Sequence, residues 1–390
     1  MRSARPRPAP FIHASPTPAA HIPLEDSLPL RDDATAWLAL TLVPGVTYTA
    51  QRSLLRAFAS PQAALSASRQ EVEQVAGDLA AKRLLDGPSP KLVDATLRWL
   101  SRPHCHMLAL GDTAYPRKLL DTPDPPCVLY ARGRIELLNE PAVAIVGSRN
   151  ATPQGLRDAE ALARALSESG LVIVSGLALG IDAAAHRGGL AGAGSSIAVM
   201  GTGPDLIYPR GNRDLASELA ARGCLISEFA VGTPSVAHNF PQRNRLISGL
   251  SRGVLVVEAA VRSGSLNTAR WALEQGRDVL AVPGSIHSAL SKGCHSLLKQ
   301  GAKLVESADD VLAELGMITR TAEMESPPDR AVERDPILDE MGFAPASIDQ
   351  LALRTGLDAA KLAAHLSCLE IAGRVRALPG GWFQRVATAL

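Results

Sequence analysis

The sequence lacks any run of apolar residues that approaches the ~20 needed to span a bilayer. Residues 1–33 are rich in proline, alanine and arginine and contain no apolar core of the kind found in secretory signals. This composition is typical of a disordered tail. We therefore expect a cytoplasmic protein that makes no membrane contact.

The chain also has few residues that could hold a metal, and its overall charge does not attract nucleic acid. Its five cysteines are far apart and never form a C-x-x-C pair, which argues against a disulfide framework or a zinc site. The consecutive residues His104, Cys105 and His106 cannot all converge on one ion in regular structure. Because the net charge is only +1, any contact with a polyanion must come from a local cluster of basic residues. We expect no metal site.

The length and composition predict several globular units. A chain of 390 residues exceeds what one core usually serves, and 46% hydrophobic with 20% charged residues is typical of a globular protein. Within 34–104, apolar residues recur at helical spacing, which indicates a small helical domain. Leu42–Val46 followed by a helix over 50–58 resembles a helix-hairpin-helix unit, a DNA phosphate binder, but Thr47 or Tyr48 replaces its second glycine. We favour a packing module over a DNA contact.

From Pro141 the pattern changes, within a predicted domain that spans 105–315 with its lead-in. Short, fully apolar runs alternate with helical stretches, which indicates strands buried on both faces. The five runs are 143–146, 171–174, 197–199, 254–257 and 279–282. They predict an α/β, Rossmann-like, doubly wound and mainly parallel sheet within 105–315. Thr152 and Pro153 mark the start of its first helix.

The last part of the chain predicts a linker and a third domain. Residues 316–335 contain Pro327–Pro328 and many charges, as a linker does. Residues 336–390 show three helical stretches and a two-stranded ribbon, the pattern of a winged helix. The predicted recognition helix is poor in arginine and lysine, so we favour protein interaction or dimerisation over base reading.

Glycine-rich loops follow the predicted strands, where ligands bind in open parallel sheets. The first loop contains Arg149 where a dinucleotide site would have further glycines, and no acidic residue ends the second strand. These loops also lack a Walker lysine. We therefore expect no nucleotide cofactor, and we expect Arg149 to bind a phosphodiester, which a guanidinium grips bidentately.

The segment Asn239–Arg245 brings together an aromatic ring, an amide and two guanidiniums in a chain with only 4% aromatic residues. This combination favours a stacking platform beside a phosphate clamp, as in proteins that bind unpaired strands. The alternative is that Phe240 packs in the core while Arg243 and Arg245 are solvated or ion-paired on a surface turn. The segment alone leaves both interpretations open.

Several blocks together make a resemblance specific. They are Val143–Arg149, Ser175–Asp182 with His186, Tyr208–Pro209, Ser227–Glu228, Phe240–Arg245, Glu258 with Ser263–Leu266, and Pro283–Gly284. In this order, and with Tyr115–Pro116 and Pro126–Tyr130 before them, the blocks resemble the DNA processing protein A family, also called DprA or Smf. The helical domain and the winged helix also match modules found in that family.

The resemblance implies a function and a site. It implies a protein that binds incoming single-stranded DNA during natural transformation, protects it, and loads a RecA-type recombinase. It also implies a homodimer. The family's DNA pocket maps onto Arg149, Gly176, Arg210, Phe240, Arg243 and Arg245.

Two acidic motifs raise the question of catalysis. Asp182 and His186 are four residues apart and could form a proton-transfer pair, but we favour an acid at a helix start that pairs with its neighbour. No nucleophile can be placed beside Glu258 from the sequence. We therefore expect no enzymatic activity. Two alternatives are a phosphoribohydrolase-like enzyme that processes nucleotides, and an architectural dimer that recruits partners through its winged helix.

Overall fold

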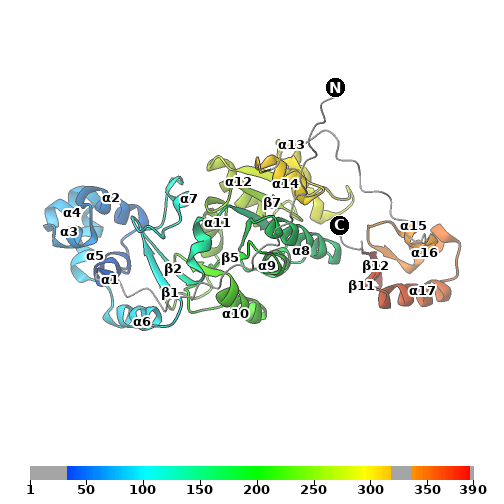
Figure 1. The fold of residues 1–390 in the computed structure, drawn as a ribbon, viewed down its shortest axis with the longest axis horizontal. Coiled ribbons are helices and arrows are strands. Elements are labelled where there is room, and N and C mark those ends of the chain that lie inside the picture. The colour runs from blue at the N-terminus through cyan, green and yellow to red at the C-terminus, as the bar shows by residue number, and fades with distance from the viewer. Residues whose placement is uncertain (1–32, 318–334, 387–390) are drawn as a thin grey trace, which may run out of the picture.

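A computed structural model describes residues 33–317 and 335–386. The predicted tail at 1–33 and the predicted linker at 316–335 lie almost entirely outside these residues. Helices, then a mixed α/β layer structure, then a small α/β unit follow one another along the chain (Figure 1).

The N-terminal unit is helical. Its helices are α1 (Ala34–Thr41), α2 (Tyr48–Phe58), α3 (Pro61–Ser66), α4 (Arg69–Ala76), α5 (Asp78–Asp86) and α6 (Pro90–Leu100). Thr47, which replaces the glycine of a helix-hairpin-helix, caps α2 by accepting the Ala50 amide. Trp37 and Trp99 pack with Tyr130 and Met107 of the following sheet. The proposed boundary at residues 104/105 falls between α6 and β1.

A nine-stranded sheet forms the centre of the molecule, with strand order β1-β2-β6-β5-β4-β3-β7-β8-β9. The strands are β1 (Cys105–Ala109), β2 (Val128–Gly133), β3 (Ala142–Val146), β4 (Val172–Ser175), β5 (Ser196–Val199), β6 (Cys224–Ser227), β7 (Gly253–Val256), β8 (Asp278–Ala281) and β9 (Lys303–Leu304). Strands β3 to β9 pair in parallel, while β1 and β2 form an antiparallel extension beside β6. This confirms the predicted Rossmann-like, mainly parallel fold. The five predicted strands correspond to β3, β4, β5, β7 and β8.

Helices cover both faces of the sheet. They are α7 (Arg117–Leu120), α8 (Pro153–Glu168), α9 (Ile181–Ala191), α10 (Arg213–Arg222), α11 (Asn239–Gly249), α12 (Ser265–Glu274), α13 (Lys292–Lys299) and α14 (Ala308–Glu314). Short 3-10 turns are η1 (Ile135–Asn139), η2 (Arg210–Asn212) and η3 (Ala289–Ser291). Val143 and Ile145 of β3 pack against α8 and α9. Ala144 and Val146, on the other face, pack with α11, α12 and α13. The sheet is therefore doubly wound.

The C-terminal unit has the predicted winged-helix elements. They are α15 (Pro336–Met341), β10 (Ala346–Ser347), α16 (Ile348–Thr355), α17 (Ala359–Ile371), β11 (Val375–Leu378) and β12 (Trp382–Arg385). Leu351, Leu362 and Leu366 centre its own hydrophobic core. Strand β10, which the sequence did not suggest, pairs with β12. Of the helices described, none is long and apolar enough to cross a membrane.

Candidate functional site

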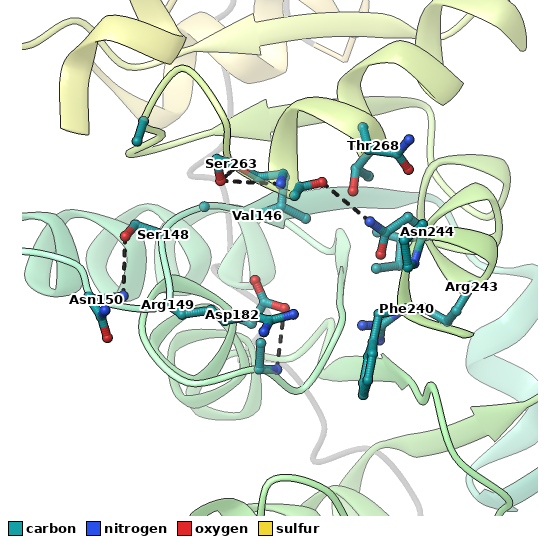
Figure 2. Close-up of a pocket in the computed structure, with 18 of the residues that line it drawn as sticks. Val146, Ser148, Arg149, Asn150, Asp182, Phe240, Arg243, Asn244, Ser263 and Thr268 are labelled. Carbon is teal, nitrogen blue, oxygen red and sulfur yellow. Dashed lines mark hydrogen bonds between the residues drawn. The ribbon is translucent and has the colours of Figure 1, made fainter. Parts of the chain in front are cut away.

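A cavity of about 740 Å³ opens at the carboxyl ends of β3 and β7 (Figure 2). These strands are neighbours, but the chain leaves β3 toward β4 on one side and later crosses to β7 on the other. The cavity therefore lies at the switch point of a doubly wound sheet, where such folds bind ligands. Ser148, Arg149 and Asn150 after β3, and Ser263 after β7, form part of its wall.

Helix α11 forms another wall. Its residues Phe240, Arg243, Asn244 and Ile247 line the cavity at spacings of three, four and seven residues, so they share one face of the helix. Gly249, on another face, lies so close to the segment before β2 that a Cβ there would meet Leu119 at 2.8 Å. The segment Asn239–Arg245 is thus the first part of a helix and not the surface turn of the alternative interpretation.

Phe240 is half-buried, with one side of its ring against the backbone after β5. A Cβ at Gly201 would lie 2.7 Å from the ring, so only glycine admits the ring there. The ring of Tyr208, which is 47% exposed, lies 5.5 Å from that of Phe240. The guanidinium of Arg149 lies 5.8 Å from the Phe240 ring centroid. Tyr208 belongs to one of the sequence motifs, but it was not among the predicted site residues.

Arg243 lies at the floor of the cavity and is itself buried. One guanidinium nitrogen donates to the carbonyl of Gly176, at 2.7 Å, and to the carbonyl of Val199. A Cβ at Gly176 would meet that guanidinium at 2.8 Å, so glycine is required. Burial lowers the pKa of Arg243 to about 10, with the neighbouring Asp182 opposing the effect. The side chain remains charged at neutral pH.

Asp182 and His186 fix the loop between β4 and α9 instead of pairing with each other. Asp182 accepts the amides of Gly176 and Ala178 at 3.1 and 3.3 Å. His186 accepts the Leu177 amide at 3.2 Å, and its other ring nitrogen contacts a serine hydroxyl. Burial lowers the pKa of His186 to about 3, so it stays neutral. Asp182 and His186 therefore form neither a proton-transfer pair nor the pairing of Asp182 with a neighbouring side chain that the sequence favoured.

Glu258 anchors the start of α8. Its two carboxylate oxygens accept the Thr152 amide at 2.9 Å and the Thr152 hydroxyl at 2.7 Å. A Cβ at Gly155 would meet this carboxylate at 2.4 Å. Burial raises the pKa of Glu258, and the Thr152 hydrogen bonds oppose this effect. The contacts give Glu258 a structural role.

The six residues implied by the resemblance occupy different places. Arg149, Phe240 and Arg243 line the cavity, and Gly176 lies directly behind Arg243. Arg210 is exposed on η2, beyond the residues that line the cavity.

Arg245 requires a correction. It is buried outside the cavity lining, and its guanidinium is ion-paired to Asp124, at 3.0 Å, and to Glu228. A helix turns by about 200° over two residues, so Arg243 and Arg245 point in different directions. This geometry does not support a phosphate contact by Arg245.

The fold and the cavity define a Rossmann-like protein with a partly basic, partly aromatic cleft at its switch point. Residues 106–316 match the family model described as DNA recombination-mediator protein A, and residues 321–381 match the DprA winged helix domain. The chain is 42% identical to Protein Smf of Escherichia coli over 311 residues, covering 77% of this chain and 83% of the relative. It is 49% identical to DNA processing protein DprA of Streptococcus pneumoniae over 203 residues, covering 52% and 72%.

The fold is shared with the solved structures of two relatives, among others. DNA processing protein A from Streptococcus pneumoniae superposes with a TM-score of 0.64 at 36% identity, covering 73% of this chain and 98% of that one. DNA processing protein A from Helicobacter pylori, whose structure is described in terms of its single-stranded DNA binding mode, superposes with a TM-score of 0.50 at 32% identity. The match covers 54% of this chain and 96% of that one. The chain belongs to the DNA processing protein A family, as the motifs suggested. The family model is described as a DNA recombination mediator.

Proposed function

We propose that the cavity at the ends of β3 and β7 binds single-stranded DNA. The observation that supports this most strongly is the arrangement of Phe240 beside Tyr208 and beneath two guanidiniums, those of Arg149 and Arg243, which lie within 6.0 Å of its ring. A base stacks on an aromatic face, and a guanidinium binds the adjacent phosphate. Both groups are present within the reach of one nucleotide.

The rest of the wall suits a sugar-phosphate backbone. Helix α11 begins at the cavity, and the first turn of α12 contributes Ser265 and Thr268. The N-terminal ends of helices favour negative charge, and hydroxyl and amide side chains can donate to phosphate oxygens. Arg210, on the exposed turn next to Tyr208, would meet a phosphate farther along the strand.

A single strand fits this site better than a duplex, because stacking on Phe240 needs a base face that pairing and stacking hide within a helix. The Helicobacter pylori relative is described as a protein that binds single-stranded DNA. This description supports the same ligand class here.

The family membership supports a wider role. We propose that the protein binds incoming DNA in the cytoplasm during natural transformation, protects it, and loads a RecA-type recombinase onto it as a homodimer. The description of the family as a DNA recombination mediator supports a role in handing DNA to a recombinase. The winged helix then serves partner recruitment or dimerisation.

The decisive experiment is a titration of the full chain with a labelled oligonucleotide, single-stranded and as its duplex. We expect tighter binding of the single strand, and weaker binding of both forms as salt increases. Equal affinity for the two forms in wild type and in Phe240→Ala would contradict the proposed site. Assaying the same preparation for base release from nucleoside monophosphates tests the rival enzyme, and measurable release would favour that rival.

A further inference from the structure

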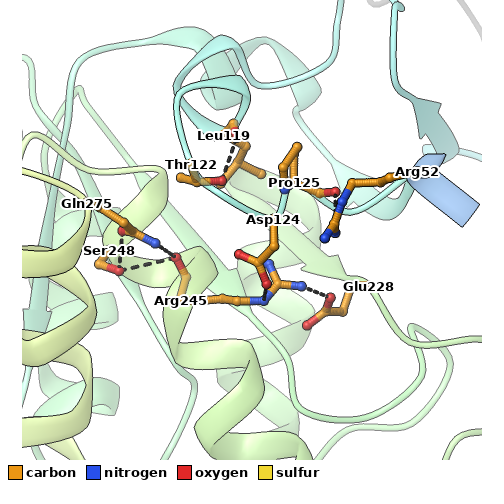
Figure 3. Close-up of polar contacts among 9 residues, drawn as sticks. All are labelled: Arg52, Leu119, Thr122, Asp124, Pro125, Glu228, Arg245, Ser248 and Gln275. Carbon is orange, nitrogen blue, oxygen red and sulfur yellow. Dashed lines mark hydrogen bonds and ion pairs between the residues drawn. The ribbon is translucent and has the colours of Figure 1, made fainter. Parts of the chain in front are cut away.

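Three charged residues from separate segments meet at Arg245 of α11, outside the lining of the cavity (Figure 3). Arg245 of α11 is ion-paired through Nε to Asp124, which precedes β2, and through a second nitrogen to Glu228, which follows β6. The side chains of Arg245 and Glu228 are 4% and 0% exposed, while that of Asp124 is 34% exposed. We call these three residues the support cluster.

Further hydrogen bonds hold the same turn of α11. The Arg245 carbonyl accepts from the side chains of Gln275, at 3.0 Å, and Ser248, at 3.2 Å. The Ser248 hydroxyl and Gln275 are themselves joined at 2.7 Å. The carbonyl of Arg245 and two of its three guanidinium nitrogens are therefore engaged by protein groups, while the third nitrogen is buried without a hydrogen-bond partner. These contacts fix the helix to the lead-in segment, to the segment after β6 and to the end of α12.

The fixed helix determines the geometry of the cavity. Phe240 and Arg243 extend from the same helix, five and two residues before Arg245. A small rotation of α11 would move the ring away from Tyr208 and break the hydrogen bond from Arg243 to the Gly176 carbonyl. We propose that Arg245, with Asp124 and Glu228, is a positioning residue for the nucleotide pocket and binds no phosphate. This inference rests on the proposed DNA-binding function of the cavity.

The helical domain touches the same cluster. Tyr48, at the start of α2, interacts electrostatically with both Glu228 and Arg245 of the cluster. Arg52, one turn later, donates to the carbonyl of Pro125 at 3.5 Å, next to Asp124. The proposal therefore assigns the helical domain a part in positioning α11, in place of a DNA contact of its own.

Asp124→Asn is the best test, because the two explanations predict opposite changes in DNA affinity. If Arg245 bound phosphate, Asp124 would compete with DNA for the guanidinium, and Asp124→Asn would strengthen binding. If the cluster positions α11, the same substitution weakens binding. Asp121→Asn is the matched control, because Asp121 lies in the same segment and its side chain is 69% exposed. Its ion pair with Arg277 is long, at 3.8 Å, so its loss should cost little.

The experiment uses the full chain in three forms, wild type, Asp124→Asn and Asp121→Asn, with a thymidine 20-mer as the probe. Substitutions in such a coupled network change affinity by about two- to thirtyfold. We expect a loss in this range for Asp124→Asn, with an unchanged salt slope, and less than a twofold change for Asp121→Asn. Tighter or unchanged binding by Asp124→Asn relative to Asp121→Asn would overturn the proposal.

Hydrogen exchange of the DNA-free proteins gives a readout that does not depend on the proposed function. We expect faster exchange of the α11 amides in Asp124→Asn and no change in Asp121→Asn. If wild type failed to bind the 20-mer, the proposed function would fail, and exchange alone would decide whether the cluster holds α11. Unchanged exchange in Asp124→Asn would overturn the positioning role in either case.

Arg245→Lys tests the cluster from its other partner. Lysine keeps the charge but cannot engage both carboxylates as a planar guanidinium does. We expect weaker binding with an unchanged salt slope and faster α11 exchange. Wild-type affinity and exchange in Arg245→Lys would contradict the role of the forked ion pair.

Arg52→Ala and Arg56→Ala test the part played by the helical domain, since both remove one charge from α2 and Arg56 is exposed. We expect Arg52→Ala alone to weaken binding, without a change in salt slope. Equal losses of salt slope in both variants would show a direct DNA contact and overturn the assignment to the helical domain. Wild-type binding by both would also overturn it.

Discussion

The guanidinium carbon of Arg149 lies 5.8 Å from the centroid of the Phe240 ring (Figure 2). Arg149 comes from the loop after β3 and Phe240 from α11, about ninety residues later. The two side chains form a contact between the loop wall and the helix wall of the cavity. Phe240 therefore both lines the cavity, where it meets Arg149, and packs one side of its ring against Gly201.

Tyr208 should contribute to binding together with Phe240. Tyr208→Ala should lower single-strand affinity by up to about 1–3 kcal/mol, the typical loss for a stacked base. Because the two rings touch, the losses from Tyr208→Ala and Phe240→Ala should not add in a double-mutant cycle. Tyr208→Phe should retain wild-type affinity. A well-folded Tyr208→Ala variant that binds as wild type would remove Tyr208 from the site.

The stability of the chain should depend on pH through Glu228. Burial raises the pKa of this carboxyl from 4.5 to about 7, in spite of the opposing effect of Arg245. Below about pH 7 the folded chain holds this proton more tightly than the unfolded chain does, and the resulting stability is lost as the pH rises from 4.5 through about 7, where the carboxyl ionises and pairs with Arg245. Glu228→Gln should lack this loss.

Urea unfolding of both proteins at pH 5 and pH 8 measures the effect. The free energy of unfolding should fall more for wild type than for Glu228→Gln over this range. His186, whose pKa is lowered to about 3, contributes in the opposite direction but equally in both proteins. The same pH dependence in the two proteins would show that Glu228 does not titrate there.

The winged helix should be dispensable for single-strand binding. It has its own core, and the hydrogen bond from Arg157 of α8 to the Gly373 carbonyl is long, at 3.5 Å. Deleting residues 330–390 should leave affinity within about twofold, because the cavity lies wholly in the sheet domain. Partner recruitment or duplex binding should disappear. A truncated protein that aggregates would show that the two units are not independent.

The sequence predicted the parallel sheet because its buried strands are short, purely apolar runs. It also predicted Arg149 at the end of β3, since loops at strand ends meet at one edge of a parallel sheet. It did not separate Arg243 from Arg245, because Asn239–Arg245 was treated as one cluster and not as the start of a helix. Helical spacing places Phe240, Arg243 and Ile247 on one face, and this signal was present in the sequence.

The partners of buried charges could not be predicted in the same way. The pairing of Arg245 with Asp124 joins residues 121 positions apart, and nothing local in either segment specifies it. The same holds for Glu258, which contacts Thr152 across the β3–β7 junction. Tertiary packing alone determines these contacts.

The central claim is that Arg149 binds phosphate while Phe240 stacks a base, and the salt dependence of single-strand binding tests it most directly. Wild type, Arg149→Ala and Phe240→Ala should be titrated with one oligonucleotide over a range of salt, with melting temperatures measured on the same preparations. Arg149→Ala should reduce the log–log slope by about 0.7 for each phosphate that the protein no longer neutralises. Phe240→Ala should lower affinity by about 1–3 kcal/mol and keep the wild-type slope, because stacking releases no counterions. An unchanged affinity and slope in both folded variants would contradict the proposed site.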